Sequence, residues 1–186
     1  MFSPLLGIAG LFRRFGRARG GATAVEFAFV ALPFFLLMVG LAEVSMIGLT
    51  QTSLDYSVSE VGRQIRTGQA QLTGKSYTQM KQALCAQMNS FLFLDCAGNL
   101  YLDVDTFQSF TDASNNNAAP IKNNKFDASG FGYSPGNPND IVVVRAYYRW
   151  QILTPLFASV FQNVSGGERI LVSTMMFRDE PYQASP

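Results

Sequence analysis

The chain has 186 residues, enough for one membrane helix and one domain of about 110 residues. It contains no histidine and two cysteines, which excludes serine–histidine and cysteine–histidine nucleophile systems and argues against a zinc site. The net charge of +1 is uneven, because four of the 14 basic residues and none of the 13 acidic ones precede Gly21. The remainder is therefore acidic overall and has no basic patch, which argues against nucleic acid as a partner.

Residues 1–21 form a basic leader that ends in the small residues Gly20 and Gly21. Its arginines are Arg13, Arg14, Arg17 and Arg19. In a secretory signal peptide the small-residue cleavage site follows the apolar region, which is then lost. Here the small residues, including Ala22, precede the apolar run. Cleavage at Gly21 would remove the leader and keep the apolar helix.

Residues 22–49 are predicted to form a transmembrane helix. The run from Phe27 to Ala42 is uninterrupted, and its flanks extend it to the roughly 20 residues that cross a bilayer. A buried core helix is the alternative. Glu26 stands at the threshold of the run, where an unpaired carboxylate is costly and marks a functional site. Glu43 lies about 25 Å further along the helix, near the far headgroups, and the arginines are expected to stay cytoplasmic.

Residues 50–68 are predicted to continue the helix as an amphipathic extension. Apolar residues recur at helical spacing among polar ones. They are Leu54, Val58, Val61 and Ile65. This stripe belongs either to the core of the domain, which we favour, or to a seam between subunits. Gly68 and Gly74 provide the expected stop, so one helix of about 45 residues would run from the membrane into the domain.

Residues 69–186 are predicted to form an extracytoplasmic α+β domain. Residues 76–93 have a helical pattern with Ser76 as its cap, and a short helix is expected at residues 155–162. Three segments have strand patterns, at residues 100–107, 141–153 and 169–177. Grouped helices and strands predict an antiparallel sheet of three or more strands packed on the helical spine.

Residues 111–140 are predicted to form a long exposed loop, because they are rich in asparagine, glycine and proline. The loop is either a recognition element, to which Phe126, Phe131 and Tyr133 would contribute, or a variable insertion.

Acidic residues in and before this stretch invite two further interpretations. A calcium site built from Asp103 and Asp105 with Asp112 or Asp140 lacks a recognisable loop spacing. A catalytic carboxylate pair from Asp95, Asp103 and Asp105 is weaker than a solvated strand face. We expect no metal, no cofactor and no enzymatic activity.

Cys85 and Cys96 are the only cysteines. In a domain outside the cytoplasm they are expected to form a disulfide between the end of the helix at 76–93 and the turn before the first strand. Two free buried thiols are the alternative.

Gly21, Glu26 at the fifth position after it and Phe27 at the sixth resemble the prepilin-peptidase site of type IV pilins. The segment from residue 21 to Pro33 is similar to the TadE-like pseudopilins of tight-adherence pilus systems. This resemblance continues through Glu43 to about Arg66, the first third of the chain. It implies a pilin-like fold, cleavage after Gly21 that leaves Ala22 as the amino terminus, and pairing of Glu26 with the amine of a neighbouring subunit.

The resemblance further implies a minor pilin or pseudopilin that initiates, caps or stabilises the pilus. Its expected partners are other pilin and pseudopilin subunits, the prepilin peptidase, the inner-membrane assembly platform and the lipid bilayer. The expected location is the bacterial inner membrane, with one span, a cytoplasmic amino terminus and a periplasmic domain that is carried into the extracellular pilus on assembly. The alternatives are an uncleaved membrane-anchored scaffold and a filament-presented adhesin that binds through residues 111–140.

Overall fold

The structure is a computed structural model that describes residues 20–89, 95–116 and 120–182. Its longest element is helix α2, Gly20–Arg66, with 47 residues. The prediction of one long amino-terminal helix is confirmed. The chain divides into two compact units, residues 1–42 and residues 43–186. The second unit therefore begins inside the segment 22–49, and the boundary of the membrane segment at residue 49 stays a prediction.

The first unit is described by α2 up to Ala42. Among the described residues, one helix is long and apolar enough to cross a membrane by length and composition, and no residue of its most apolar stretch is buried. Phe27, for example, is 70% exposed. A core helix of a water-soluble domain would bury such side chains, so the buried-core alternative is wrong. Of the predicted leader, only Gly20 and Gly21 lie within the described residues.

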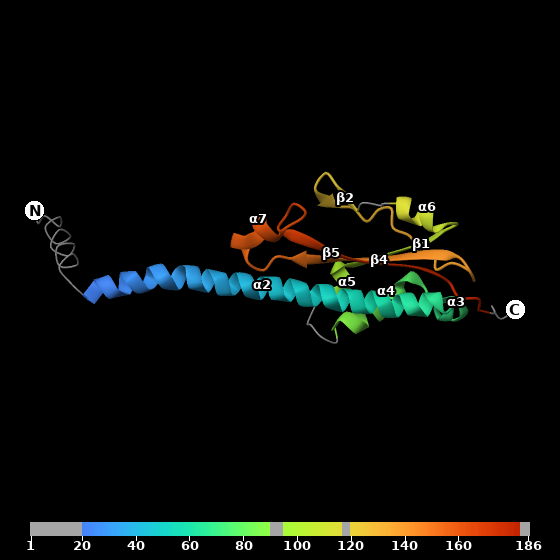
Figure 1. Ribbon diagram of the computed structural model, residues 1–186, viewed down its shortest axis with the longest axis horizontal. Helices are drawn as coiled ribbons and strands as arrows, with labels where there is room; N and C mark the ends of the chain where they lie inside the picture. The colour runs from blue at the N-terminus through green and yellow to red at the C-terminus, as the bar shows by residue number, and fades with distance from the viewer. Residues whose placement is uncertain (1–19, 90–94, 117–119, 183–186) are drawn as a thin grey trace, which may run out of the picture. The chain divides into compact units, whose positions relative to one another are not determined.

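The second unit combines short helices with an antiparallel sheet (Figure 1). The helical elements are α3 (Gln69–Leu72), α4 (Tyr77–Asn89), α5 (Cys96–Asn99), α6 (Phe110–Asn115), η1 (Pro155–Phe157) and α7 (Ala158–Phe161). The strands are β1 (Leu100–Phe107), β2 (Ile121–Lys122), β3 (Lys125–Phe126), β4 (Ile141–Gln151) and β5 (Glu168–Arg178). Strands β1, β4 and β5 form one antiparallel sheet in that order, and β2 pairs with β3. The predicted α+β class and the antiparallel sheet are confirmed.

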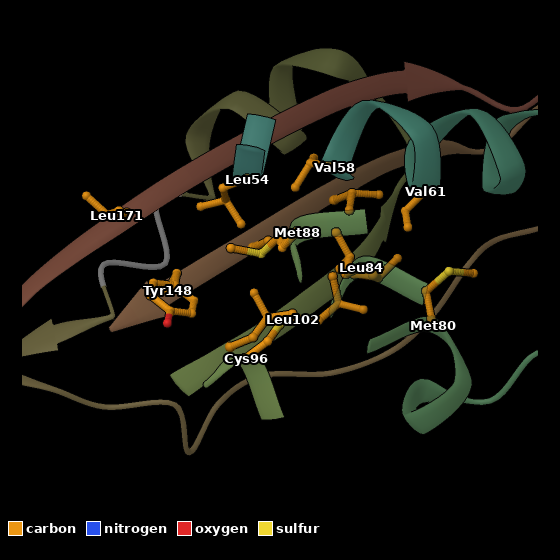
Figure 2. Close-up of a cluster of buried hydrophobic side chains, with 14 of the residues drawn as sticks. Leu54, Val58, Val61, Met80, Leu84, Met88, Cys96, Leu102, Tyr148 and Leu171 are labelled. Carbon is orange, nitrogen blue, oxygen red and sulfur yellow. The ribbon is translucent and has the colours of Figure 1, made fainter. Parts of the chain in front are cut away.

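The main core lies between the sheet, α4 and the second half of α2 (Figure 2). The stripe of α2 is 0–1% exposed and contacts apolar residues of α4 and the sheet. The stripe consists of Leu54, Val58, Val61 and Ile65. It therefore belongs to the domain core, as we favoured, rather than to a seam between subunits. Gly62 allows this packing, since a Cβ there would overlap the side chain of Met175 on β5.

The helix ends follow the predicted signals. Gly68 has a φ of 76°, in the left-handed region that glycine favours. Ser76 and Gln79 form a reciprocal cap at the start of α4: the Gln79 amide donates to Ser76 Oγ at 3.4 Å, and the Ser76 amide donates to Gln79 Oε1 at 2.9 Å. The last predicted turn of this helix, residues 90–93, lies outside the described residues.

Cys85 and Cys96 form a disulfide that joins α4 to α5, immediately before β1. Closing a loop of this size is expected to stabilise the fold by about 3 kcal/mol, chiefly by restricting the unfolded chain. The alternative of two free thiols is wrong.

The described part of the stretch 111–140, residues 111–116 and 120–140, is more ordered than the long exposed loop that the sequence predicted. It contains most of α6 and a β2–β3 hairpin whose turn residues Asn123 and Asn124 both have positive φ. In Figure 1 this stretch lies over the face of the sheet that is turned away from α2. Phe126 and Phe131 pack there against Tyr147. The sequence suggested Phe126 and Phe131 for a recognition surface, whereas in the structure they anchor this stretch on the sheet. Strand β4 becomes a central strand buried on both faces.

Candidate functional site

The start of α2 brings the predicted processing and assembly residues onto the first two turns of the helix. Gly21, Glu26 and Phe27 are all exposed. Ala22 and Glu26 are four residues apart, so their backbones lie on the same side of the helix. If Ala22 became the amino terminus, Glu26 would stand at the end of the first turn, where free amides and the helix dipole favour an anion.

Within the described part of the chain, Glu26 takes part in no ion pair. Its neighbours on the helix are apolar and exposed, Val25 and Phe27 among them. A carboxylate on such a surface is stable in a membrane only with a partner charge or water.

Glu43 has the opposite environment. It is only 3% exposed, and its carboxylate accepts four hydrogen bonds from the region where β4 ends and η1 begins. Oε1 accepts from Trp150 Nε1 at 3.2 Å and from the Leu153 amide at 3.1 Å. Oε2 accepts from the amide and the hydroxyl of Thr154, at 3.1 and 3.0 Å. We call these four residues the Glu43 clamp.

The Glu43 clamp joins segments more than 100 residues apart in the chain. The sequence placed Glu43 near the far headgroups but did not identify its partners. One signal was present, because a buried tryptophan usually needs an acceptor for its indole N–H, and Trp150 is the only tryptophan. The clamp fixes the end of β4 on α2 at the point where the second unit begins.

The acidic residues of β1 pair with an arginine on the neighbouring strand. Asp103 lies directly opposite Arg145 in the β1–β4 register, and Arg145 Nη1 is 3.3 Å from Oδ2 of both Asp103 and Asp105. Arg145 Nη2 also donates to the carbonyl of Asn116 at 2.9 Å. Asp103 Oδ1 accepts from the Gly132 amide at 3.0 Å. This network holds the covering stretch 111–140 against the sheet.

The other acidic candidates have local structural contacts. Asp95 caps α5, Asp112 bonds to the cap residue of α6, and Asp140 accepts from the Asn137 amide. Among the described residues, no three histidine, cysteine or acidic side chains are placed to hold a metal. Burial, together with the charge of Asp103, raises the pKa of Asp105, against the attraction of Arg145.

Asp179, at the end of β5, is a buried carboxyl at the opposite end of the domain from the Glu43 clamp. It is 2% exposed, and Oδ2 accepts from Gln71 Nε2 at 3.3 Å. Asp179 Oδ1 and Gln71 Oε1 are buried without partners among the described atoms. Burial, and then the charge of Asp140, raises the pKa of Asp179 from 3.8 to about 7. Tyr182 is a further titratable group facing it, and its pKa is raised chiefly by burial.

We predict that this carboxyl makes the domain less stable as pH rises from about 4 to about 7. Below pH 4 both folded and unfolded chains hold the proton, whereas between pH 4 and pH 7 the folded chain keeps a proton that the unfolded chain has lost, so rising pH favours unfolding. The loss is at most roughly 4 kcal/mol. Asp179→Asn should flatten this part of the stability profile and stabilise the protein at pH 8. Urea unfolding of the full-length protein in detergent micelles measures it.

The same titration of Asp127→Asn, a partly exposed carboxyl paired with Lys122, serves as the control and should leave the slope between pH 4 and pH 7 unchanged, because the bond to Lys122 lowers the pKa of Asp127 below this range. Equal slopes for wild type and Asp179→Asn would contradict the prediction.

Within the described residues, these features define a protein with one candidate membrane helix and an α+β domain built on the second half of that helix. Residues 21–63 match the family model described as TadE-like protein. The matched segment includes Gly21, Glu26, Phe27 and Glu43, so the resemblance found in the sequence is confirmed over this segment. The family is a structural, non-enzymatic one of tight-adherence pilus systems. No curated protein and no solved structure matches the chain.

Proposed function

We propose that the protein is a minor pilin or pseudopilin that initiates, caps or stabilises tight-adherence pilus assembly. The observation that carries this proposal is the match over residues 21–63, which begins at Gly21 and includes Glu26 at the head of an exposed apolar helix. In this proposal a prepilin peptidase cuts after Gly21 and the helix remains as the membrane anchor. The domain then lies on the periplasmic side and contacts other pilus subunits.

The environment of Glu26 supports a role in assembly. An ion pair with the free amine of a neighbouring subunit's Ala22 would reduce the cost of both charges in a medium of low dielectric constant. Glu43 is already satisfied within its own domain by the clamp, which makes it a poor candidate for that pairing. In this proposal Glu43 makes contacts within its own subunit, and Glu26 makes contacts between subunits.

The aromatic side chains that suggested an adhesive loop are engaged inside the domain. Phe126 and Phe131 pack on Tyr147, and the hairpin turn is held by Ser165, which donates to the Asn124 carbonyl at 2.8 Å. This arrangement favours a scaffold role for residues 111–140, and we do not propose an adhesin.

The mass of the mature amino terminus tests the processing step. In membranes with an active prepilin peptidase, we expect the chain to begin at Ala22. Gly21→Ile should block cleavage without disturbing the helix, since a Cβ at Gly21 meets no atom within 4 Å. A wild-type chain that retains Met1 under these conditions would support the uncleaved anchor instead.

Glu26→Ala is predicted to insert into the membrane normally and to impair assembly. Removing one partner of a buried ion pair costs about 3 kcal/mol or more, which weakens subunit pairing roughly a hundredfold. Filament counts and co-purification of pilus subunits measure the effect. Thr23→Ala, an exposed polar change one turn earlier, is the matched control and should assemble normally. Normal piliation by Glu26→Ala would exclude the pairing role.

A further inference from the structure

The segment that follows the Glu43 clamp exposes apolar side chains to an unusual degree. Leu153, Leu156 and Val160 are 65%, 63% and 69% exposed. We call these three residues the apolar tip. Phe157 and Phe161 contact each other at 5.7 Å between ring centroids, and Ala158 and Phe161 pack on the main core. The segment that carries the tip is therefore packed against the domain, whereas the three side chains of the tip are mostly exposed.

The tip also lacks charge. Residues 150–167 include no acidic or basic side chain, although the domain as a whole is acidic. A water-facing connection between two strands is usually polar, since loops lie at the surface. Protruding leucine and valine side chains on an uncharged segment suit the boundary between headgroups and acyl chains, where apolar groups enter about 5–10 Å deep.

The Glu43 clamp fixes the position of the apolar tip along the axis of α2. Thr154, the N-cap of η1, is bonded to Glu43 through both its amide and its hydroxyl. Glu43 comes 20 residues after Thr23, the start of the candidate membrane span, which is about 30 Å along a helix. That distance equals the thickness of the hydrocarbon core of a bilayer. The tip is thus tied to the helix where the hydrocarbon ends.

The exposed apolar surface continues onto α2 itself within the same unit. Val44, Met46 and Leu49 are all exposed beyond the clamped residue. We propose that the apolar tip inserts into the outer surface of the bilayer beside the helix, so that the domain rests on lipid before assembly. This inference relies on the proposed membrane anchor. It adds a second, shallow membrane contact that extraction into a filament would have to break.

Site-specific fluorescence quenching in lipid nanodiscs tests the proposal with the full-length protein. Both native cysteines are in the disulfide, so an introduced cysteine is the only free thiol. Leu156→Cys and Val160→Cys, each labelled with an environment-sensitive dye, should lose most of their emission to lipids spin-labelled at a shallow acyl carbon. Leu72→Cys is the matched control, an exposed leucine (51%) on α3 at the other end of the domain, and should be unaffected.

Two other results would overturn the proposal. If the dyes at Leu156→Cys and Val160→Cys are unquenched and emit as in water, like the dye at Leu72→Cys, the tip faces solvent. A blue-shifted but unquenched emission that depends on protein density means that a second copy covers the tip. A label at Val30→Cys, in the candidate span, distinguishes failure of this inference from failure of the proposed anchor. Quenching at Val30→Cys without quenching at Leu156→Cys rejects insertion of the tip alone. No quenching at Val30→Cys rejects the membrane anchor as well.

Discussion

Glu43→Ala is expected to destabilise the domain by about 3–4 kcal/mol. The substitution removes both carboxylate oxygens and leaves the indole N–H of Trp150 and the amides of Leu153 and Thr154 without their acceptors. Each buried donor left unsatisfied costs about 1–3 kcal/mol, and water entry recovers part of this. Urea unfolding of the full-length protein in detergent micelles gives the free energy.

Trp150 is the only tryptophan and a member of the clamp, so its emission reports the site directly. We expect a red shift in native Glu43→Ala, because water replaces the lost carboxylate. Glu43→Gln keeps one acceptor oxygen but turns an amide N–H₂ toward other donors, and an intermediate loss of about 2 kcal/mol is expected.

The matched control for the clamp is Glu60→Ala on the same helix. Glu60 pairs with Arg63 at the surface, so its loss should cost under about 1 kcal/mol. Equal unfolding midpoints for Glu43→Ala and Glu60→Ala would show that the clamp contributes nothing to stability.

Arg145→Met is expected to cost about 3–5 kcal/mol. The substitution leaves Asp103, which is almost fully buried, without its cation and removes the bond to the Asn116 carbonyl. Breaking a buried pair by removing one partner leaves an uncompensated charge in a poorly solvated site. The covering stretch should loosen as well, so hydrogen exchange at the Gly132 amide, which donates to Asp103, should accelerate.

Arg149→Met provides a matched control on the same strand and the same face of the sheet. Its partner Glu168 is partly exposed, so a loss of about 1 kcal/mol or less is expected. The double variant Asp103→Leu/Arg145→Met should recover part of the stability, since the fully buried charge of Asp103 is gone and Asp105, which also loses Arg145, is partly exposed. A double variant less stable than Arg145→Met would mean that Asp103 acts through its bond to Gly132 rather than through charge.

The elements governed by local periodicity could be predicted from the sequence. The stripe on α2 is buried as predicted. The strands β1, β4 and β5 begin and end within two residues of their predicted bounds. In these segments the alternation of apolar and polar residues fixes both the element and its buried face. The Gly21–Glu26 motif was equally visible, because its spacing lies within one helix.

The Glu43 clamp and the packing of residues 111–140 on the sheet could not be predicted from local periodicity. The asparagine-rich composition of residues 111–140 predicted an exposed loop. In the structure a few aromatic contacts and the Asp103–Arg145 pair hold the described residues of this stretch on the sheet. Glu43 read as an acidic residue at a membrane boundary, and nothing near it in the chain indicated its four donors.

The sequence by itself determined the long helix, its exposed acidic head, the order of the strands along the chain and the disulfide partners, because each depends on short-range spacing or on composition. Only the tertiary structure decided that Glu43 bonds to Trp150 and Thr154, that residues 111–140 cover the sheet, and that an apolar tip stands beside the clamp. Those features depend on which distant segments meet when the strands pair in one register. That choice is made by the packing of the whole domain.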